Sequence, residues 1–579
     1  MACPGQPADR CLILPTESAT RLARMTPEDV AEVVHAAIAS AVAAQELALA
    51  QSPPVSDIVI ERPRNEAHGD YATNIAMRLA RPAGRPPREV AAILASHVAA
   101  QPGIQSAEVA GPGFLNIVLD AAAAGELAAA VVAAGDAYGA SDALAGVRIN
   151  VEFISANPTG PLHLGHTRWA AVGDALARVL AAAGAEVVRE FYINDRGVQM
   201  DRFGESLFAA AHGRPAPPDG YHGGYIVDVA AALVAADPAL LELAAPEAIP
   251  AFREAGYAHQ LAAQQAVLAL FGTHFDVWYS ERSLHDRGAV DRGFAALAAG
   301  GHMFTQDGAT WLRTSDFGDD KDRVLVKSDG ELTYFASDSA YYVDKRARGF
   351  DICIYLLGAD HHGYVGRLKA IAACAGDDPE TNIEVLIGQL VKIYRGGVEV
   401  RLSKRAGDIV TLEDLVDEVG VDAARYSLIR YPADSPLTLD LEVLVARTND
   451  NPVFYVQYAH ARISSVLRHA ADLQIDWRSA EFQPSALSHP REKDLLGVIG
   501  ALPGIIAGAA ELREPHRVAR YLEELANAYH KFYDSCRVLP RSDESVTTQT
   551  IARLWLCAAA RQTLANGLGV LGVSAPERM

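Results

Sequence analysis

The chain has 579 residues, half of them apolar, and a net charge of -21 at pH 7. This length implies roughly three or four domains, and the composition is that of an ordinary globular protein rather than a disordered or fibrous one. The acidity argues against a general nucleic-acid coat, although the part after Arg447 has about as many basic as acidic residues and leaves room for a local polyanion site.

The scattered single cysteines form no CxxC pair, which disfavours both a zinc site and a disulfide framework. The sequence has no uninterrupted apolar stretch of about 18 residues and no signal-peptide core, so export and a membrane span are not expected. A reducing cytosol is the natural compartment.

The first part of the chain predicts a small α+β domain over residues 25–140. Residues 1–24 are polar and unpatterned, so we expect an unstructured extension or a start codon placed too early. Thr26, Pro27 and Asp29 are typical of a helix N-cap, a first-turn proline and an acidic first turn. Helix-like and strand-like runs then alternate at 28–47, 56–63, 87–100 and 114–119.

Residues 141–445 predict an open parallel sheet of βαβ units. Strands that alternate with helices are typical of such sheets, which often bind nucleotides. The strand-like runs lie at 147–154, 187–195, 351–358 and 383–393. Residues 204–300 begin with the Pro/Gly-rich stretch HGRPAPPDGYHGGY and continue in helices, which indicates an insertion. Residues 446–579 have helical spacing without a clear strand and predict a helical bundle.

A strand-to-helix turn, NPTGPLHLGHTR at 157–168, carries the first candidate chemistry. The N-terminus of a helix gathers unpaired N–H groups, and glycine and proline in the loop let a phosphate approach the backbone. His163 and His166 lie one helical turn apart and add two donors on one face. As a zinc site the pair is weak, because no third ligand is suitably spaced. Taken alone, two such histidines are more often structural than catalytic.

A basic loop, KIYRGGVEVRLSKRAGDIV at 392–410, carries the second group of candidate catalytic residues. Arg401, Lys404 and Arg405 follow a Gly-Gly turn, and such a loop can deliver charge to phosphates in the transition state. A solvated surface loop is the plainer interpretation. Activation of Ser403 by Lys404 as a nucleophile lacks the SxxK spacing.

Together the two motifs resemble the signatures of class I aminoacyl-tRNA synthetases: HLGH is similar to HIGH, and LSKR is similar to KMSKS. Longer runs narrow the resemblance to bacterial-type arginyl-tRNA synthetases, namely VEFISANPTGPLHLGH, YINDRGVQM, GADHHGY, LSKRAGDIVTLEDLVDEVGVDAARY, DNPVFYVQYAHARI and LGVSAPERM. ERPRNEAHGDYATNIA and GPGFLNIVL extend it to nearly everything from Met25 onward. Leu402 and Asp408 depart from the usual Met and Asn, and a Leu-for-Met exchange conserves volume.

The resemblance implies a Rossmann-like α/β catalytic domain, an N-terminal α+β domain that contacts tRNA, and a C-terminal all-α bundle that binds the anticodon. It implies ATP-dependent activation of L-arginine to arginyl-adenylate and transfer to the 3′ end of tRNA-Arg. Mg²⁺ is expected to accompany ATP with few protein ligands, and no resident metal is expected. A cytoplasmic monomer without membrane contact is expected.

The resemblance also implies the site residues. His163, His166 and Lys404 are expected to stabilise phosphate charge. The implied ATP-binding residues are Pro161, His163, Gly165, His166, Asp360, His361, Lys404 and Arg405. The implied arginine-binding residues are Glu152, Ser155, Asn157, Tyr334, Asp338 and His361, with Glu152 and Asp338 facing the guanidinium. The implied tRNA contacts are Tyr71, Asn74, Tyr455, Tyr458, His460, Arg462 and Met579.

Plainer interpretations stand beside these. Glu152 alone reads as a solvated carboxylate at a strand end, and Asp338 as an acid near a helix N-terminus. Tyr455 and Tyr458 fit a helical core equally well. Two other functions remain open: a non-tRNA adenylyltransferase with the same HxGH turn, and a non-catalytic synthetase-like protein that binds tRNA. The intact motif residues and the helical C-terminal region disfavour both.

Overall fold

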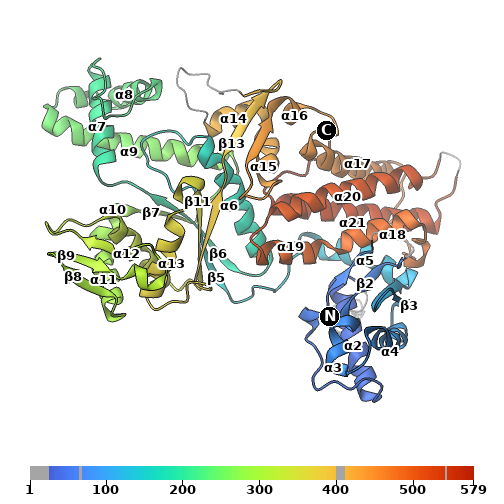
Figure 1. The fold of residues 1–579 in the computed structure, drawn as a ribbon. Helices are drawn as coiled ribbons and strands as arrows, with labels where there is room; N and C mark the ends of the chain where they lie inside the picture. Colours follow the sequence, from blue (N-terminus) through green and yellow to red (C-terminus); the bar gives the residue numbers. More distant parts are fainter. Residues whose placement is uncertain (1–24, 64–67, 400–410, 542–543) are drawn as a thin grey trace, which may run out of the picture.

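The computed structural model describes residues 25–63, 68–399, 411–541 and 544–579. Figure 1 shows a parallel-sheet region on the left and a helical bundle on the right, with the N-terminal domain beneath the bundle. Along the chain, an antiparallel sheet with helices is followed by a parallel sheet and then by helices.

The N-terminal domain packs helices against an antiparallel sheet of order β1-β2-β4-β3. Its helix α2 begins as predicted, because the Thr26 hydroxyl accepts from the Asp29 backbone N–H while the Asp29 carboxylate accepts from that of Thr26. The strand predicted over 56–63 is mostly irregular: a 3₁₀ turn, Val55–Asp57, overlaps its start, and only Ile60–Glu61 form β1. The elements are α2 (Pro27–Ala43), β1 (Ile60–Glu61), β2 (Tyr71–Thr73), α3 (Ile75–Ala83), α4 (Pro87–Ala99), β3 (Ile104–Ala110) and β4 (Phe114–Leu119).

The next helix, α5 (Ala121–Ala134), packs mainly with the C-terminal bundle rather than with this domain. Leu127 and Val131 are buried in the large core that continues through the parallel sheet into the bundle. Asn566, in the last helix of the chain, donates to the Tyr138 carbonyl at 2.8 Å. The core of the N-terminal domain itself ends at Leu119, earlier than the boundary expected near residue 140.

The central sheet is parallel, with order β12-β11-β5-β6-β7. Its strands are β5 (Arg148–Glu152), β6 (Glu186–Ile193), β7 (Val277–Ser280), β11 (Ile352–Gly358) and β12 (Ile383–Gly388). The run predicted as one strand over 383–393 divides between β12 and β13 (Val391–Arg395), and β13 belongs to a separate sheet of order β14-β13-β15.

The insertion expected at 204–300 is shorter in the structure. Helices α7 (Val198–Ala211), α8 (Gly224–Ala236) and α9 (Ala245–Leu270) share their own apolar cluster. β7 follows at Val277–Ser280 and pairs with β6 in the central sheet, so the chain has rejoined the main fold well before residue 300. Four residues of strand between helices are too few for periodicity to detect.

The remaining segments flank the sheet and form the bundle. A small antiparallel sheet of order β10-β9-β8 lies beside α11 and α12. The elements on this side are α10 (Glu281–Asp286), α11 (Ala289–Ala299), β8 (Met303–Gln306), β9 (Ala309–Leu312), β10 (Arg323–Val326), α12 (Tyr334–Ala347) and α13 (Tyr364–Cys374). The rest are β14 (Val398–Glu399), α14 (Leu412–Val419), α15 (Val421–Ile429), β15 (Leu437–Asp440), α16 (Leu441–Val445), α17 (Pro452–Asp472), α18 (Pro490–Gly500), α19 (Leu502–Glu511), α20 (His516–Ser535) and α21 (Thr548–Val570).

Helix α6 (Leu164–Ala182) carries the second histidine of the HLGH motif and lies directly against β5. Gly173 makes this approach possible, because a Cβ atom there would lie 2.4 Å from the Phe153 ring. The start of α6 is therefore held at the carboxyl edge of the sheet, where ligands of open α/β sheets bind.

Candidate active site

The signature turn (residues 157–166) joins β5 to α6, and its two histidines cap the helix. His163 Nδ1 accepts a hydrogen bond from the Gly165 backbone N–H at 3.1 Å, and His166 Nδ1 accepts from the His163 N–H at 3.4 Å. The two ring centroids lie 3.9 Å apart. Because both Nδ1 atoms accept, each neutral ring carries its proton on Nε2.

Both histidines are neutral at pH 7. Burial, followed by the neighbouring His163, lowers the pKa of His166 to about 3, and burial also lowers the pKa of His163. Within the described residues, neither Nε2 atom takes part in a hydrogen bond. The turn thus offers two outward N–H donors beside the helix N-terminus, an arrangement suited to phosphate oxygens.

The segment after the basic loop pairs with this turn. His163 and Thr411 form an antiparallel bridge, and the Leu412 N–H donates to the Leu162 carbonyl at 2.9 Å. Lys404 and Arg405 themselves lie outside the described residues.

Beside the turn, β5 ends in a strained corner. Ile154 and Ser155 have φ angles of 70° and 40°, in the left-handed region that side chains with a Cβ rarely adopt. The corner aims the Ser155 hydroxyl at Glu152 Oε1, to which it donates at 2.8 Å. Ser155 Oγ in turn accepts a hydrogen bond from the Tyr192 N–H at 3.2 Å. Strain of this kind is typical of functional sites.

Glu152 is already paired inside the protein. Lys345, fully buried on α12, places Nζ 2.5 Å from Glu152 Oε2 and 3.9 Å from the Tyr355 ring centroid. Glu152 therefore differs from the expectation that it faces a substrate guanidinium, because its charge is neutralised before any ligand arrives. Sequence reasoning missed Lys345, whose partner lies 193 positions away.

Two further acids at the same edge of the sheet have no such partner. Burial, with the nearby Glu152 and Glu281 carboxylates, raises the pKa of Asp338 to about 7. Burial and Asp195 raise the pKa of Glu281, the first residue of α10, to about 7. No hydrogen bond or ion pair within the described residues reaches either carboxylate. Such unpaired acids are prepared for an incoming cation.

Glu281 was not among the expected residues, because β7 was assigned to the insertion. The signal was present as an acid directly after the apolar, aromatic run VWYS, at the carboxyl end of β7, much as Glu152 is the last residue of β5. We call Glu152, Ser155, Glu281 and Asp338 the acidic pocket.

The other expected ligands lie around this edge. Tyr334 begins α12 and is 71% exposed, one helical turn before Asp338. Asp360 and His361 follow β11 on an exposed 3₁₀ turn, where their side chains approach to 3.4 Å. Three more of the expected residues lie within the signature turn itself, namely Asn157, Pro161 and Gly165.

Comparisons with known proteins agree over most of the chain. Residues 23–119 match the arginyl tRNA synthetase N terminal domain, residues 130–208 and 274–434 match the catalytic domain of class I (R) tRNA synthetases, and residues 456–579 match the DALR anticodon binding domain. The arginine–tRNA ligase of Frankia alni is 58% identical over 555 residues, which cover 96% of this chain and all of that one. The arginine–tRNA ligase of Kineococcus radiotolerans is 56% identical with the same coverage.

This chain belongs to the arginyl-tRNA synthetases. The fold agrees, since the Thermus thermophilus arginyl-tRNA synthetase superimposes with a TM-score of 0.72 at 23% identity, covering 96% of this chain and all of that one. The enzyme family and the α/β architecture with a C-terminal helical domain are thus as expected.

In the C-terminal bundle, the enzyme places some expected tRNA contacts at the surface and buries others. Tyr458 is 38% exposed and stacks on Phe454, and the Arg462 guanidinium lies 4.0 Å from the Tyr533 ring centroid. Tyr455 is half-buried, and Met579 at the end of the chain is exposed.

His460 is buried, and its Nδ1–H donates to the Pro576 carbonyl at 2.9 Å. It fastens the C-terminal tail to α17, as the buried Gln457 does by donating to the Ser574 carbonyl. The structure therefore places His460 in packing rather than on an RNA-facing surface.

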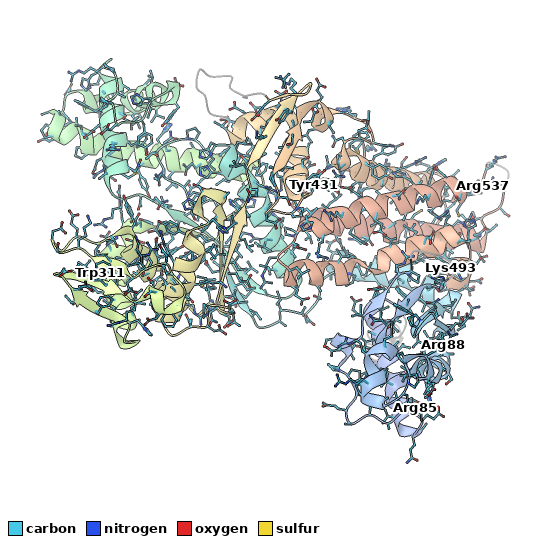
Figure 2. The ribbon with its side chains drawn as sticks, in the orientation of Figure 1. Arg85, Arg88, Trp311, Tyr431, Lys493 and Arg537 are labelled. Carbon is cyan, nitrogen blue, oxygen red and sulfur yellow. The ribbon has the colours of Figure 1, made fainter. Side chains whose placement is uncertain are left out.

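The N-terminal domain shows a similar contrast. Tyr71 is buried and donates its hydroxyl proton to the Met25 carbonyl at 3.2 Å, which differs from the expected tRNA contact. Asn74, just before α3, has a buried Oδ1 without a partner among the described residues. Arg85, in the turn between α3 and α4, and Arg88, in the first turn of α4, are instead exposed on this domain (Figure 2).

Among the described residues, one stretch, Pro490–Glu511, has the length and apolar composition of a membrane span. It is divided between α18 and α19, and Leu495, Ile499 and Ile506 bury its apolar face inside the bundle.

Proposed function

We propose that the enzyme activates L-arginine with ATP as arginyl-adenylate and transfers it to the 3′ end of tRNA-Arg, using the signature turn for ATP and the acidic pocket for arginine. The observation that carries the assignment of the pocket is the pair of acids without a partner among the described residues, the buried Glu281 and the half-buried Asp338, with pKa values of about 7. A guanidinium supplies the fixed planar donors that two such carboxylates lack.

In the first step, the arginine carboxylate attacks the α-phosphorus of ATP and pyrophosphate leaves. The Nε2–H groups of His163 and His166 donate to phosphate oxygens, where negative charge increases in the transition state. Their neutrality suits this role, because a neutral ring keeps Nδ1 as the acceptor that caps α6. Lys404 supplies a full positive charge to the same oxygens. The protein needs no nucleophile of its own, because the substrate carboxylate attacks.

Arginine recognition uses acids of two kinds. Asp338 and Glu281 face the guanidinium, whereas Glu152, fixed by Lys345 and Ser155, forms the floor of the pocket. Lysine cannot donate in a planar fork, and a neutral side chain leaves both acids without a counter-ion, so each binds less well. A separate editing site is then unnecessary.

Mg²⁺ enters with ATP in this proposal. Within the described residues, no group of three or more His, Cys, Asp or Glu side chains is arranged to hold a metal ion. A cation held mainly by phosphate oxygens and water needs no such group and neutralises charge on the leaving pyrophosphate. Asp360 and His361 border the ATP side of the sheet edge.

The tRNA is contacted at both ends of the molecule. In the bundle, Tyr458, Tyr455 and Arg462 supply the stacking and cationic groups that an unstacked anticodon loop accepts. In the N-terminal domain, the exposed Arg85 and Arg88 supply the cations that phosphates require, a role that Tyr71 is too buried to take. We place the enzyme in the cytoplasm, where its tRNA is used, acting as a monomer without membrane contact.

The test is ATP–pyrophosphate exchange with each amino acid, with and without tRNA-Arg, followed by arginylation of the tRNA. Exchange with arginine alone supports the assignment of the pocket. Exchange with another amino acid contradicts the roles of Asp338 and Glu281, and an enzyme that supports neither reaction contradicts the proposal as a whole.

A further inference from the structure

The signature turn is held by a side chain from outside the motif. Gln264, on α9 of the insertion, is 2% exposed, and its Nε2 donates to the Asn157 carbonyl at 3.1 Å and the Gly160 carbonyl at 2.9 Å. These carbonyls lie within residues 156–161, for which the described residues provide no backbone–backbone hydrogen bond. One amide group therefore fixes the backbone just before HLGH.

The insertion covers this turn in a second place. A Cβ atom on Gly160 would lie 3.4 Å from the Tyr225 hydroxyl oxygen, so α8 also approaches the turn. Both α8 and α9 fall between the two segments that match the class I catalytic domain. The insertion, which lies outside the matched segments, thus packs on the backbone that precedes HLGH.

We propose that Gln264 is a positioning residue for adenylate formation. In this proposal α9 acts as a brace that sets the distance between residues 157–160 of the signature turn and the middle of α6. The inference rests on the assignment of ATP to that turn. Gln264 does not touch substrate; it acts through the Asn157 and Gly160 carbonyls, whose displacement moves Pro161, His163 and Gly165 with them.

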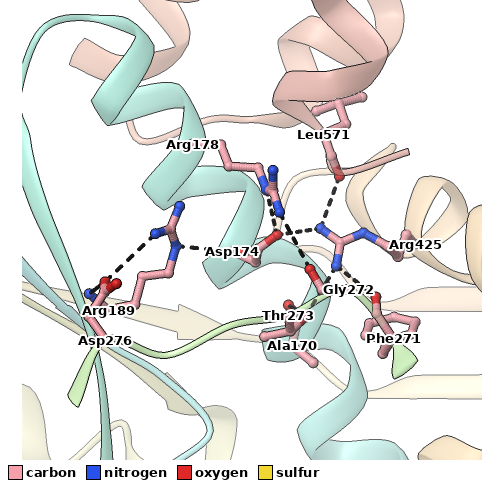
Figure 3. A network of polar contacts seen from close by, with 10 residues as sticks. All are labelled: Ala170, Asp174, Arg178, Arg189, Phe271, Gly272, Thr273, Asp276, Arg425 and Leu571. Carbon is pink, nitrogen blue, oxygen red and sulfur yellow. Dashed lines mark hydrogen bonds and ion pairs between the residues drawn. The ribbon is translucent and has the colours of Figure 1, made fainter. Parts of the chain in front are cut away.

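A brace needs a fixed base, and the structure provides one at the carboxyl end of α9. Arg425, fully buried, donates to the Phe271 carbonyl at 3.0 Å and to Asp174 Oδ2 on α6 at 2.6 Å (Figure 3). Thr273 donates to the Ala170 carbonyl on α6 at 2.8 Å. The end of α9 is thereby tied to the same helix whose first turn carries His166.

The base also includes the C-terminal bundle. Arg425 NH2 donates to the Leu571 carbonyl just after α21 at 3.1 Å, and a Cβ atom on Gly572 would lie 2.2 Å from that nitrogen. Arg178 and Arg189 surround the other side of Asp174 (Figure 3). The end of α9, the middle of α6 and the end of α21 therefore share one buried charge network.

The test compares Gln264→Met with Gln260→Met. Gln260 lies one helical turn earlier on the same face of α9 and is 5% exposed, but no hydrogen bond within the described residues reaches its side chain. Both variants keep the apolar packing of α9, and only the first removes the bonds to the turn. Gln264→Asn, which draws the amide back by one methylene and weakens its bonds to both carbonyls without removing the donor, is the milder second variant.

The readout is arginine-dependent ATP–pyrophosphate exchange with tRNA, measured well below the temperature at which the protein unfolds. The melting temperature of each variant is determined separately. We expect Gln264→Met to lower kcat roughly 10- to 100-fold, the loss expected when reacting groups are misplaced by about 1 Å. The KM for arginine should stay nearly unchanged, because Glu281 and Asp338, which face the guanidinium, lie on α10 and α12. The kcat of Gln264→Asn should fall between those of Gln264→Met and the unmodified enzyme. Gln260→Met should keep the kcat of the unmodified enzyme.

Equal kcat values for the Gln264 and Gln260 variants, with only the melting temperature lowered, would overturn the inference and leave a structural role. An equal rise in the KM for arginine would also overturn it, because the effect would then reach beyond the turn. If the unmodified enzyme shows no exchange with arginine, the proposed function fails instead, so the two failures are distinguishable.

Discussion

Lys345 Nζ lies 2.5 Å from Glu152 Oε2, and both side chains are buried between β5 and α12. The pair divides the acids at this edge of the sheet into two groups. The Glu152 carboxylate is paired within the protein, whereas the Asp338 and Glu281 carboxyl groups have no partner among the described residues and are available to a ligand. The distinction leads to separate predictions for stability and for arginine binding.

Lys345→Met should destabilise the protein. Removing one partner of a buried pair leaves an uncompensated carboxylate, which costs about 3 kcal/mol of unfolding free energy. The double variant Lys345→Met/Glu152→Gln should recover most of that loss, because no charge then remains to bury. Urea denaturation of both variants checks this, and additive losses would show that the two residues act independently.

Arginine binding should weaken as the pH falls below about 7. Asp338 and Glu281 must be ionised to hold the guanidinium, and their pKa values of about 7 lie in the working range. The KM for arginine should rise by up to about tenfold per pH unit for each proton taken up, as the pair titrates together.

Calorimetry at pH 6.5 in buffers of different ionisation enthalpy should detect proton release when arginine binds, and none at pH 8.5. The sign for folding is opposite. The native acids hold protons that the unfolded chain has lost, so these two groups lower stability as the pH rises from about 4 to 7. A KM that does not vary between pH 6 and 8 would refute the assignment of both acids.

His166 should tolerate Gln better than Asn. Asn retains an acceptor near the Nδ1 position that caps α6 but has nothing at Nε2, whereas Gln places an amide N–H near Nε2. If the outward donor matters, His166→Asn should lower kcat by about 100-fold, and His166→Gln should lose less. Pre-steady-state adenylate formation measures this. The reverse order would assign the histidine to capping alone.

Tyr458→Ala should raise the KM for tRNA by about tenfold, the effect expected when one base loses an aromatic stacking partner. His460→Ala should leave that KM nearly unchanged and lower the unfolding free energy by about 1 kcal/mol, because its hydrogen bond holds the C-terminal tail. Arginylation at varied tRNA concentration and urea denaturation separate the two. A His460→Ala variant with weak tRNA binding and normal stability would contradict the packing role.

Sequence patterns predicted the elements with strong local signals. The N-cap at Thr26, the strand Phe114–Leu119 and the strands Arg148–Glu152 and Ile352–Gly358 all lie where capping residues or apolar runs indicate them. The sequence patterns did not predict β7, because a four-residue strand has no measurable period. Glu281, which follows β7, was therefore not predicted as a site residue either.

Relationships across the chain were beyond reach for a physical reason. The motif identified His163 and His166, but their use of Nδ1 as capping acceptors depends on backbone geometry. The burial of Tyr71 and His460 likewise depends on Met25 and Pro576, which no local pattern associates with them.

The packing of α5 on the C-terminal bundle has a consequence for how the molecule is made. The burial of Leu127 and Val131 is complete only when α21 is present. Tyr138 is held by Asn566, which donates to its carbonyl, and by the Ile499 carbonyl, which accepts from its hydroxyl. During synthesis, this stretch leaves the ribosome hundreds of residues before its partners do. Its apolar face must stay unburied for most of translation, so the large core closes only as the last helix emerges, while the separate core of the N-terminal domain can form early.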